Sequence, residues 1–255
     1  MQPLHDVDRP EDLPAWLQIA RNEEADVGRI SVIVPTLNEA QQIARTLEAA
    51  QQGNPHEIIV VDGGSNDETK EVAARTGAKV LSSPRGRSRQ MNTGAANATG
   101  NSLIFVHADT VLPADWPQVV SGILRGPAVA AGAFRFRVAD DFGGKWIVEA
   151  TTKLRSRWFQ LPYGDQALFL QRSLFEELGG FADLPILEDY ELVRRLRARG
   201  RVITASESAL TSGRRWKRLG SFRTTLTNQL VINGYHLGVC PRRLAAFYRG
   251  HRLAE

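Results

Sequence analysis

The 255-residue sequence contains only one cysteine, Cys240. A single cysteine excludes an intramolecular disulfide and is compatible with a reducing compartment. No run of about 18 consecutive apolar residues occurs, so we expect no segment that spans a bilayer. The amino terminus has neither the basic region nor the apolar core of a signal peptide, and we expect none. Together these absences favour a cytoplasmic protein.

Several recognition motifs are also missing. No cysteine and histidine spacing fits a zinc finger, and no aromatic-rich strand fits an RNA-binding sheet, so we expect no nucleic-acid partner. No Gly-x-Gly-x-x-Gly motif follows the first predicted strand, which argues against a dinucleotide site of the Rossmann type.

The formal net charge is only +4, but basic residues gather locally. The three clusters are Arg85, Arg87 and Arg89; Arg194, Arg195, Arg197, Arg199 and Arg201; and Arg214, Arg215, Lys217 and Arg218. Solvated helix faces explain much of the second cluster. An anionic substrate or an acidic lipid surface is the alternative for the others.

Length and composition predict one globular domain, since hydrophobic residues make up 42% and charged residues 24% of the chain. Residues 1–28 are polar and interrupted by proline, and we expect a flexible arm. Residues 29–210 form the predicted domain. Residues 211–255 form a helical extension that we expect to pack on the domain; peripheral contact with the inner face of a membrane is the alternative.

Four short apolar runs predict buried parallel strands at 30–35, 57–62, 79–81 and 103–106, with helices between them. This alternation is typical of an α/β, doubly wound, mostly parallel sheet. The second half is less regular. We expect an edge or antiparallel strand at 128–138, a helix at 144–158, a strand at 166–170, a helix at 173–178 and another that begins at Glu188.

Polar residues stand where three of these strands end. Asn38 and Glu39 follow the first strand, Asp62 ends the second, and His107–Asp109 follows the fourth. Adjacent strands lie about 4.8 Å apart, so their ends can line a single pocket. Simpler interpretations are open: Asn38 and Glu39 suit the cap and first turn of a helix, and an aspartate after a strand is often a turn former.

The residue types at these ends fit a phosphate-bearing substrate. One carboxylate can accept a hydrogen bond from a base or ribose, and another can hold a divalent cation. A later helix begins with Glu188 and Asp189, where the helix dipole helps to keep a carboxylate ionised. A nucleotide pocket, a metal ligand and a separate base are the components of a transferase that uses a diphosphate-linked donor.

Five motifs in this order resemble those of the family-2 glycosyltransferases, which have the GT-A fold. They are Val34–Glu39, Ile59–Thr69, Arg87–Gly100, His107–Asp109 and Glu188–Leu196. The resemblance implies a mostly parallel doubly wound sheet with an antiparallel edge portion and a C-terminal helical tail. Within the family, the pattern is most similar to soluble bacterial members, including a branch associated with arsenosugar biosynthesis.

The resemblance also implies a role for each matched residue. The expected nucleotide-sugar-binding residues are Pro35, Thr36, Asn38, Glu39, Asp62, Gly63, Arg87, His107 and Ala108. Asp109 is the expected ligand of Mg²⁺ or Mn²⁺, and Asp189 is the expected catalytic base, supported by Glu188. His107 stands where the family usually has aspartate. This departure predicts a weaker metal site, with the imidazole either near the ribose or as a second ligand.

The implied reaction moves a hexose, with inversion, from a UDP- or GDP-linked donor to the hydroxyl of an unknown acceptor. A nucleotidyltransferase on a similar sheet is an alternative, although no Gly-rich phosphate loop follows the first strand. A non-catalytic nucleotide-sugar-binding protein is another. Arg214–Trp216 is faintly similar to the Arg-Trp motif of polysaccharide synthases, but the membrane helices of those enzymes are missing, so we do not expect processive synthesis.

Overall fold

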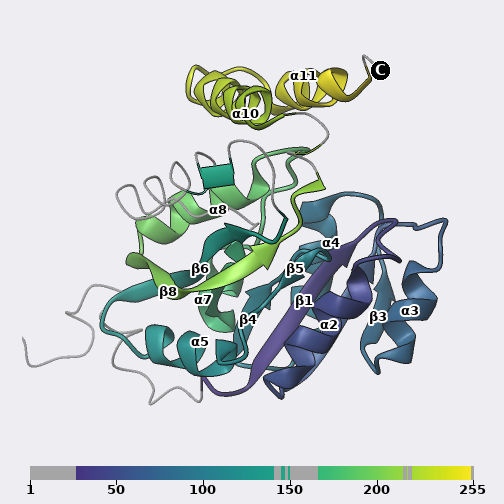
Figure 1. Ribbon diagram of the computed structural model, residues 1–255. Helices are drawn as coiled ribbons and strands as arrows, with labels where there is room; N and C mark the ends of the chain where they lie inside the picture. Colours follow the sequence, from purple (N-terminus) through teal and green to yellow (C-terminus); the bar gives the residue numbers. More distant parts are fainter. Residues whose placement is uncertain are drawn as a thin grey trace, which may run out of the picture.

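The computed structural model describes residues 27–140, 166–214 and 220–253, together with Lys145, Trp146, Glu149 and Lys217. Within these residues one eight-stranded sheet runs through the molecule in the order β3-β2-β1-β4-β7-β6-β8-β5 (Figure 1). Most of the predicted arm at 1–28 and of the predicted helix at 144–158 lies outside the described residues.

The strands are β1 (Ile30–Thr36), β2 (Glu57–Asp62), β3 (Lys79–Ser82), β4 (Ser102–Phe105), β5 (Thr110–Val111), β6 (Val129–Val138), β7 (Phe169–Gln171) and β8 (Arg201–Thr211). The helices are α2 (Ile43–Gln52), α3 (Thr69–Arg75), α4 (Arg87–Ala96), α5 (Trp116–Leu124), α7 (Arg172–Glu177), α8 (Glu188–Arg197), α10 (Ser221–His236) and α11 (Pro241–Leu253).

The first half of the sheet is the parallel unit that the sequence predicts. β1 pairs in parallel with β2 and with β4, and β2 pairs in parallel with β3. Every residue of β1 is buried, because helices cover both faces of the sheet. Val32 and Val34 pack into one hydrophobic cluster, whereas Ile33 packs into the other, as the alternation of side chains along a strand requires.

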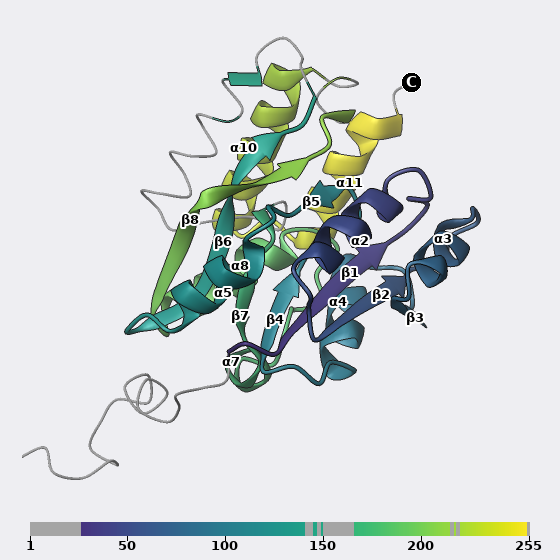
Figure 2. The same cartoon turned by 60° about the horizontal axis from the view of Figure 1, so that its bottom comes forward.

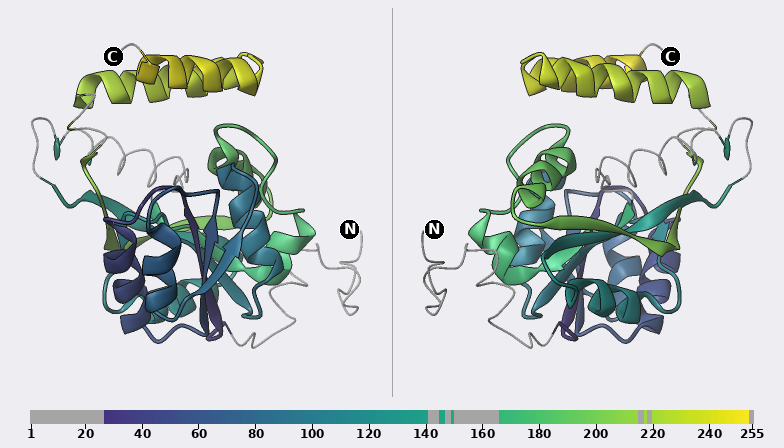
Figure 3. Two further views of the ribbon diagram at one scale, coloured as in Figure 1. Left: turned by 90° about the vertical axis from the view of Figure 1, so that its right-hand side faces the viewer. Right: turned by 90° about the vertical axis from the view of Figure 1, so that its left-hand side faces the viewer.

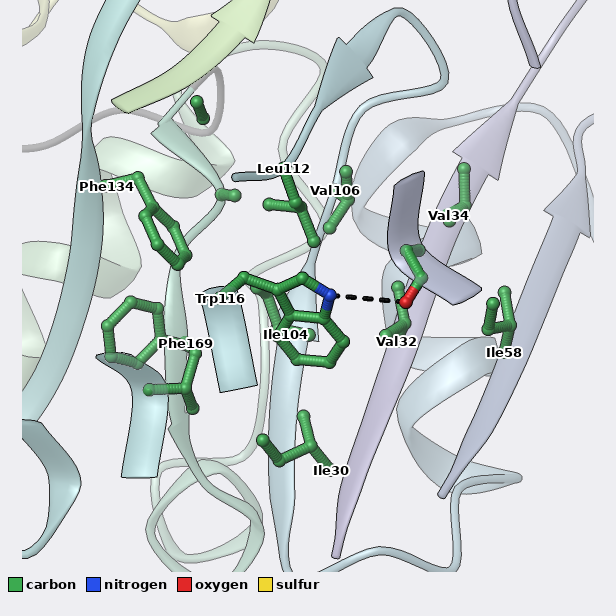
Figure 4. Packing of buried hydrophobic residues seen from close by; sticks show 14 of the residues in the cluster. Ile30, Val32, Val34, Ile58, Ile104, Val106, Leu112, Trp116, Phe134 and Phe169 are labelled. Carbon is green, nitrogen blue, oxygen red and sulfur yellow. Dashed lines mark hydrogen bonds between the residues drawn. The ribbon is translucent and has the colours of Figure 1, made fainter. Parts of the chain in front are cut away.

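Helices α2, α3 and α5 supply the first of these clusters, and α4, α7 and α8 supply the second (Figures 1 and 2). Trp116 of α5 is fully buried at the centre of the first cluster, between Phe169 and the β1 and β4 side chains (Figure 4). Its indole Nε1 donates a hydrogen bond to the carbonyl oxygen of Ala50 at 3.2 Å. This bond satisfies the one polar atom of a large apolar side chain.

Close approach between α4 and the sheet requires a glycine. A Cβ atom on Gly94 would overlap the side chain of Ile33 on β1. The small residues of α4 therefore bring the start of this helix, with Arg87 and Gln90, near the ends of β1 and β2.

The second half contains the antiparallel portion. β7 pairs antiparallel with both β4 and β6, whereas β6 and β8 run parallel. The predicted strand at 166–170 is partly wrong, because β7 begins only at Phe169. Ala167 has a left-handed backbone (φ 49°), and the side chain of Gln166 donates to the carbonyl oxygen of Phe134 at 2.9 Å. The long strand β8, Arg201–Thr211, is not among the predicted elements.

The C-terminal helices α10 and α11 lie side by side as a pair beside the domain (Figure 3). The pair contacts α8 through Tyr190, whose hydroxyl hydrogen-bonds with Nε2 of His236 and whose ring meets that of Tyr235 edge-on, with centroids 6.0 Å apart. In the part of the chain that the structure describes, no helix is long and apolar enough to cross a membrane.

Candidate active site

The loops after β1 and β2 are joined to each other by hydrogen bonds. The backbone N–H of Asn38 donates to Oγ of Ser65 at 2.8 Å, and Oδ1 of Asn38 accepts from the backbone N–H of Asn66 at 2.9 Å. Asn38 has a left-handed backbone (φ 54°), and α2 begins only at Ile43. The expectation that Asn38 caps this helix is therefore wrong, because its side chain holds the neighbouring loop instead.

Asp62 shapes the second of these loops. The residue is 1% exposed, and its carboxylate accepts hydrogen bonds from the backbone N–H groups of Gly64 at 2.9 Å and Ser65 at 3.0 Å. The hydroxyl of Ser65 donates to the same carboxylate. Each carboxylate oxygen has two lone pairs, so Asp62 retains the capacity to accept a hydrogen bond from a ligand.

Gln90 of α4 holds the ends of β1 and β2 together, a role that the sequence analysis missed. Its buried Nε2 donates to the carbonyl oxygens of Thr36 and Val61, both at 2.8 Å. A Cβ atom on Gly63 would stand 3.0 Å from this amide, so the glycine allows the loop to pass close to it. Among the described residues, the buried hydroxyl of Thr36 has no hydrogen-bond partner.

The carboxylates of Glu39 and Asp109, which follow different strands, both lie near the guanidinium group of Arg214. Nη2 of Arg214 lies 2.7 Å from Oε2 of Glu39 and 3.5 Å from Oδ2 of Asp109. The side chains of Glu39 and Asp109 are about a quarter exposed, at 26% and 25%. Arg214 therefore completes a charged cluster with two carboxylates that each lie more than 100 residues before it in the sequence.

Burial makes these two carboxylates reluctant to ionise. It raises the pKa of Glu39 above 4.5 and that of Asp109 above 3.8, and the cationic Arg214 limits both increases. The negative charge of Asp109 also raises the pKa of Glu39. A bound cation would therefore stabilise the ionised forms of Glu39 and Asp109.

A second charged pair lies at the start of α8. Nη1 of Arg87, the first residue of α4, is 3.4 Å from Oε1 of the buried Glu188. Burial raises the pKa of Glu188 above 4.5; Arg87 opposes this effect, and Asp189 adds to it. Asp189 is half-buried, and its Oδ1 accepts a hydrogen bond from the backbone N–H of Tyr190 at 2.7 Å.

His107 and Ala108 lie between β4 and Asp109. Burial, assisted by the charge of Arg87, holds the pKa of His107 well below 6.5, so its imidazole is neutral at pH 7. A neutral imidazole can accept a hydrogen bond or ligate a metal. The carbonyl oxygen of Ala108 accepts a hydrogen bond from Oγ1 of Thr46 at 2.9 Å, which fixes the turn that carries Asp109.

The structure thus brings the predicted residues to one edge of the sheet. Pro35 and Thr36 pair with Val61 and Asp62 in the β1–β2 register, and Asp109 meets Glu39 through Arg214. In the ranges that the structure describes, no group of three or more His, Cys, Asp or Glu side chains forms a complete metal site. Two converging carboxylates fit a divalent cation that also binds substrate phosphates, because Mg²⁺ commonly takes only one or two protein carboxylates.

The raised pKa of Asp109 has a consequence for stability. The folded protein releases this proton at higher pH than the unfolded chain does, so the unfolded chain binds fewer protons and stability falls as pH rises through the interval. Without metal, Asp109→Asn is expected to increase the free energy of unfolding at pH 7, with the difference shrinking below about pH 4. Urea denaturation at a series of pH values measures it.

The matched control for this substitution is Glu48→Gln, which removes an exposed carboxylate on α2. Its effect on the free energy of unfolding at pH 7 should be small. An Asp109→Asn protein that is equally or less stable than the native protein at pH 7 would contradict the raised pKa.

Comparison with known proteins agrees with this fold. The described sheet, with its parallel half and antiparallel portion, is that of the GT-A glycosyltransferases. Residues 31–182 match the family described as Glycosyl transferase family 2. The chain therefore belongs to glycosyl transferase family 2.

Two curated relatives illustrate the family. The chain is 25% identical over 234 residues to the probable glycosyltransferase YdaM of Bacillus subtilis, which covers 78% of this chain and 53% of that protein. It is 30% identical over 167 residues to the glucosyl-3-phosphoglycerate synthase of Mycolicibacterium smegmatis, covering 55% of this chain and 53% of the synthase. The chain thus spans about half the length of these relatives.

Solved structures share the fold. The glucosyl-3-phosphoglycerate synthase of Mycobacterium tuberculosis, in complex with Mn²⁺ and uridine-diphosphate-glucose, superposes with a TM-score of 0.59 at 20% identity, over 89% of this chain and 86% of that one. S. aureus TarS in complex with UDP-GlcNAc gives a TM-score of 0.57 at 16% identity, over 72% and 58%. At these identities the likeness concerns the fold.

Proposed function

We propose that this protein transfers a hexose from a nucleoside diphosphate sugar to an acceptor hydroxyl, with inversion and with the aid of a divalent cation. The observation that carries the proposal is the convergence of Glu39 and Asp109, from the ends of two strands, on the guanidinium of Arg214. The carboxylates stand beside strand ends that already hold a constrained loop around Asp62.

The nucleoside is bound by the loops after β1 and β2. Asp62 accepts a hydrogen bond from the base, and Asn38 and Gly63 form the wall of the pocket. The buried hydroxyl of Thr36 supports this assignment, because an unpaired buried hydroxyl costs about 1–3 kcal/mol and a ligand can supply its missing partner. Pro35, Ala108 and His107 complete the binding surface, with His107 toward the ribose or the metal.

Asp109 would hold Mg²⁺ or Mn²⁺, with Glu39 close by. When bound, the cation neutralises charge on the leaving diphosphate. Arg214 already supplies positive charge at this place, and it has to yield its contacts with Asp109 when the donor binds. Arg87 lies near enough to influence both Asp109 and His107, and it provides a second cationic group for the diphosphate.

Asp189 removes the proton from the acceptor hydroxyl. The acceptor oxygen then forms its bond to the anomeric carbon on the face opposite the diphosphate, the bond from that carbon to the diphosphate oxygen breaks, and the nucleoside diphosphate leaves. Glu188 supports this step by positioning Arg87, to which it is paired at 3.4 Å. The protein supplies much of the remaining acceleration by holding donor and acceptor in the reactive orientation.

The donor to test first carries UDP, since the structural neighbours named above were solved with UDP-sugars; GDP is the alternative carrier. Membership of the arsenosugar-associated branch stays a prediction, and so does the catalytic role of each residue. Thermal-shift measurements with UDP- and GDP-sugars, with and without Mn²⁺, test the proposal. Stabilisation by one donor that increases with Mn²⁺ is expected, and no stabilisation by any donor would contradict it.

The nucleotide pocket yields a separate prediction. Asp62→Ala is expected to weaken nucleoside diphosphate binding by about 1–3 kcal/mol, the scale of a hydrogen bond to a charged group, as measured by calorimetry. Ser65→Ala is the matched control, because it removes the hydroxyl that bonds to Asp62 and Asn38 while leaving the carboxylate. Equal losses for both variants would mean that Asp62 acts by shaping the loop.

A further inference from the structure

The paired C-terminal helices carry a charge that the rest of the chain does not share. Residues 221–253 contain five arginines and no aspartate or glutamate, although the whole protein has a net charge of only +4. The remainder of the protein is therefore net acidic. A concentrated positive segment of this kind attracts an anionic surface.

One face of α10 is also apolar and exposed to solvent. Leu226, Leu230 and Leu237 lie along a single stripe of the helix, with exposed fractions of 48%, 49% and 83%. Spacings of four and seven residues place them on one side of the helix. Arg223 precedes them on the same stripe, three residues before Leu226.

The opposite face of α10 accounts for its packing. Val231 and Ile232 are buried on this helix, as are Leu244 and Ala245 on α11. The leucine stripe is thus additional to the apolar surface that the two helices bury. Exposed apolar area beside arginines is the pattern of a helix that lies in the interface of a membrane.

We infer that residues 221–253 form a docking surface for a membrane that contains anionic lipid. The leucine stripe enters the boundary between headgroups and acyl chains, and Arg223 and Arg243 contact anionic headgroups. A second copy of this chain fits less well, since a symmetric dimer through this stripe would oppose two segments that each lack any acidic residue. This inference is independent of the proposed reaction.

Vesicle co-sedimentation of the full-length protein tests the inference. Binding is expected to vesicles of phosphatidylcholine mixed with phosphatidylglycerol, and much less to phosphatidylcholine alone. Binding should fall as salt rises from about 0.1 M to about 1 M, because the Debye length contracts from about 10 Å to about 3 Å. Equal binding to both kinds of vesicle, or to neither, would overturn the inference.

Two variants identify the surface. Arg223→Gln with Arg243→Gln is expected to weaken binding to anionic vesicles about thirtyfold, since each basic residue near such a surface contributes about a fivefold factor. Arg75→Gln with Arg125→Gln removes the same charge from exposed positions on α3 and beside α5, and it should have much less effect. Equal losses in the two double variants would contradict a local docking surface.

Leu226→Ser with Leu230→Ser tests the apolar contribution. These leucines are half-exposed, so the variant should keep its thermal stability while losing at least about tenfold in vesicle affinity. Analytical ultracentrifugation of the native protein and this variant tests whether the stripe instead contacts a second copy of the chain. A native dimer that the two serines dissociate, without vesicle binding, would assign the stripe to a second copy and refute the membrane surface.

Discussion

Replacing Asp189 with asparagine is expected to slow glycosyl transfer by about 10²–10⁴-fold, the contribution of a general base. Asparagine keeps the size of the side chain but cannot take the proton of the acceptor hydroxyl. Nucleotide and metal binding should remain near native, because those contacts belong to Glu39, Asp62 and Asp109. Release of nucleoside diphosphate in the presence of acceptor, measured beside donor affinity, checks both expectations.

A simpler explanation exists for the acids at the start of α8. Glu188, Asp189 and Glu191 all stand in the first turn, where a helix dipole favours them. On that explanation, Asp189→Asn changes stability by about 0.3–1 kcal/mol and leaves turnover within about threefold of native. Glu188→Gln is the matched comparison, and it should cost less than Asp189→Asn. A loss confined to Glu188→Gln would move the base to that buried carboxylate.

Replacing Asp109 with alanine is expected to abolish the increase in nucleotide affinity that Mn²⁺ produces in the native protein. Transfer should fall by about 10²–10³-fold, because a cation at the diphosphate contributes several kcal/mol. Isothermal titration calorimetry with and without Mn²⁺ separates the loss of metal from any loss of nucleotide contact. Equal enhancement by Mn²⁺ in the native protein and the variant would remove Asp109 from the metal site.

Two companion variants make that result specific. Arg214→Gln leaves both carboxylates in place while removing the guanidinium between them, so enhancement by Mn²⁺ should persist or increase. His107→Ala should have a smaller effect than Asp109→Ala. If the two effects are equal, the neutral imidazole is a metal ligand and the site has a second protein donor.

The parallel half of the fold could be predicted from the sequence because its signal is local. β1, β2 and β4 are mostly apolar runs, and burial on both faces leaves no alternation of polar and apolar residues to confuse the pattern. The second half depends on long-range pairing. β8 is missing from the predicted elements because it pairs along the whole of β6 through two irregularities in register, and neither is visible in a local pattern.

The residues of the candidate site also differ in whether a local sequence pattern identifies them. Asp62 and Asp109 could be identified because each follows a buried strand, and the fold places both at one edge of the sheet. Arg214 could not, since only tertiary structure brings it to Glu39, 175 residues away. Gln90 was part of a recognised motif, but its contacts with Thr36 and Val61 depend on the close approach of α4 to the sheet.

Phosphorus NMR of the reaction products distinguishes glycosyl transfer from nucleotidyl transfer and from simple binding. The protein is incubated with Mn²⁺ and the nucleoside diphosphate sugar that stabilises it most, and the phosphorus species are followed over time. Slow release of nucleoside diphosphate without acceptor is expected from the native protein, and this release should be lost in Asp189→Asn or Asp109→Ala. Release of pyrophosphate would indicate a nucleotidyltransferase, and a donor that binds but stays intact would indicate a binding protein; either result would contradict the account.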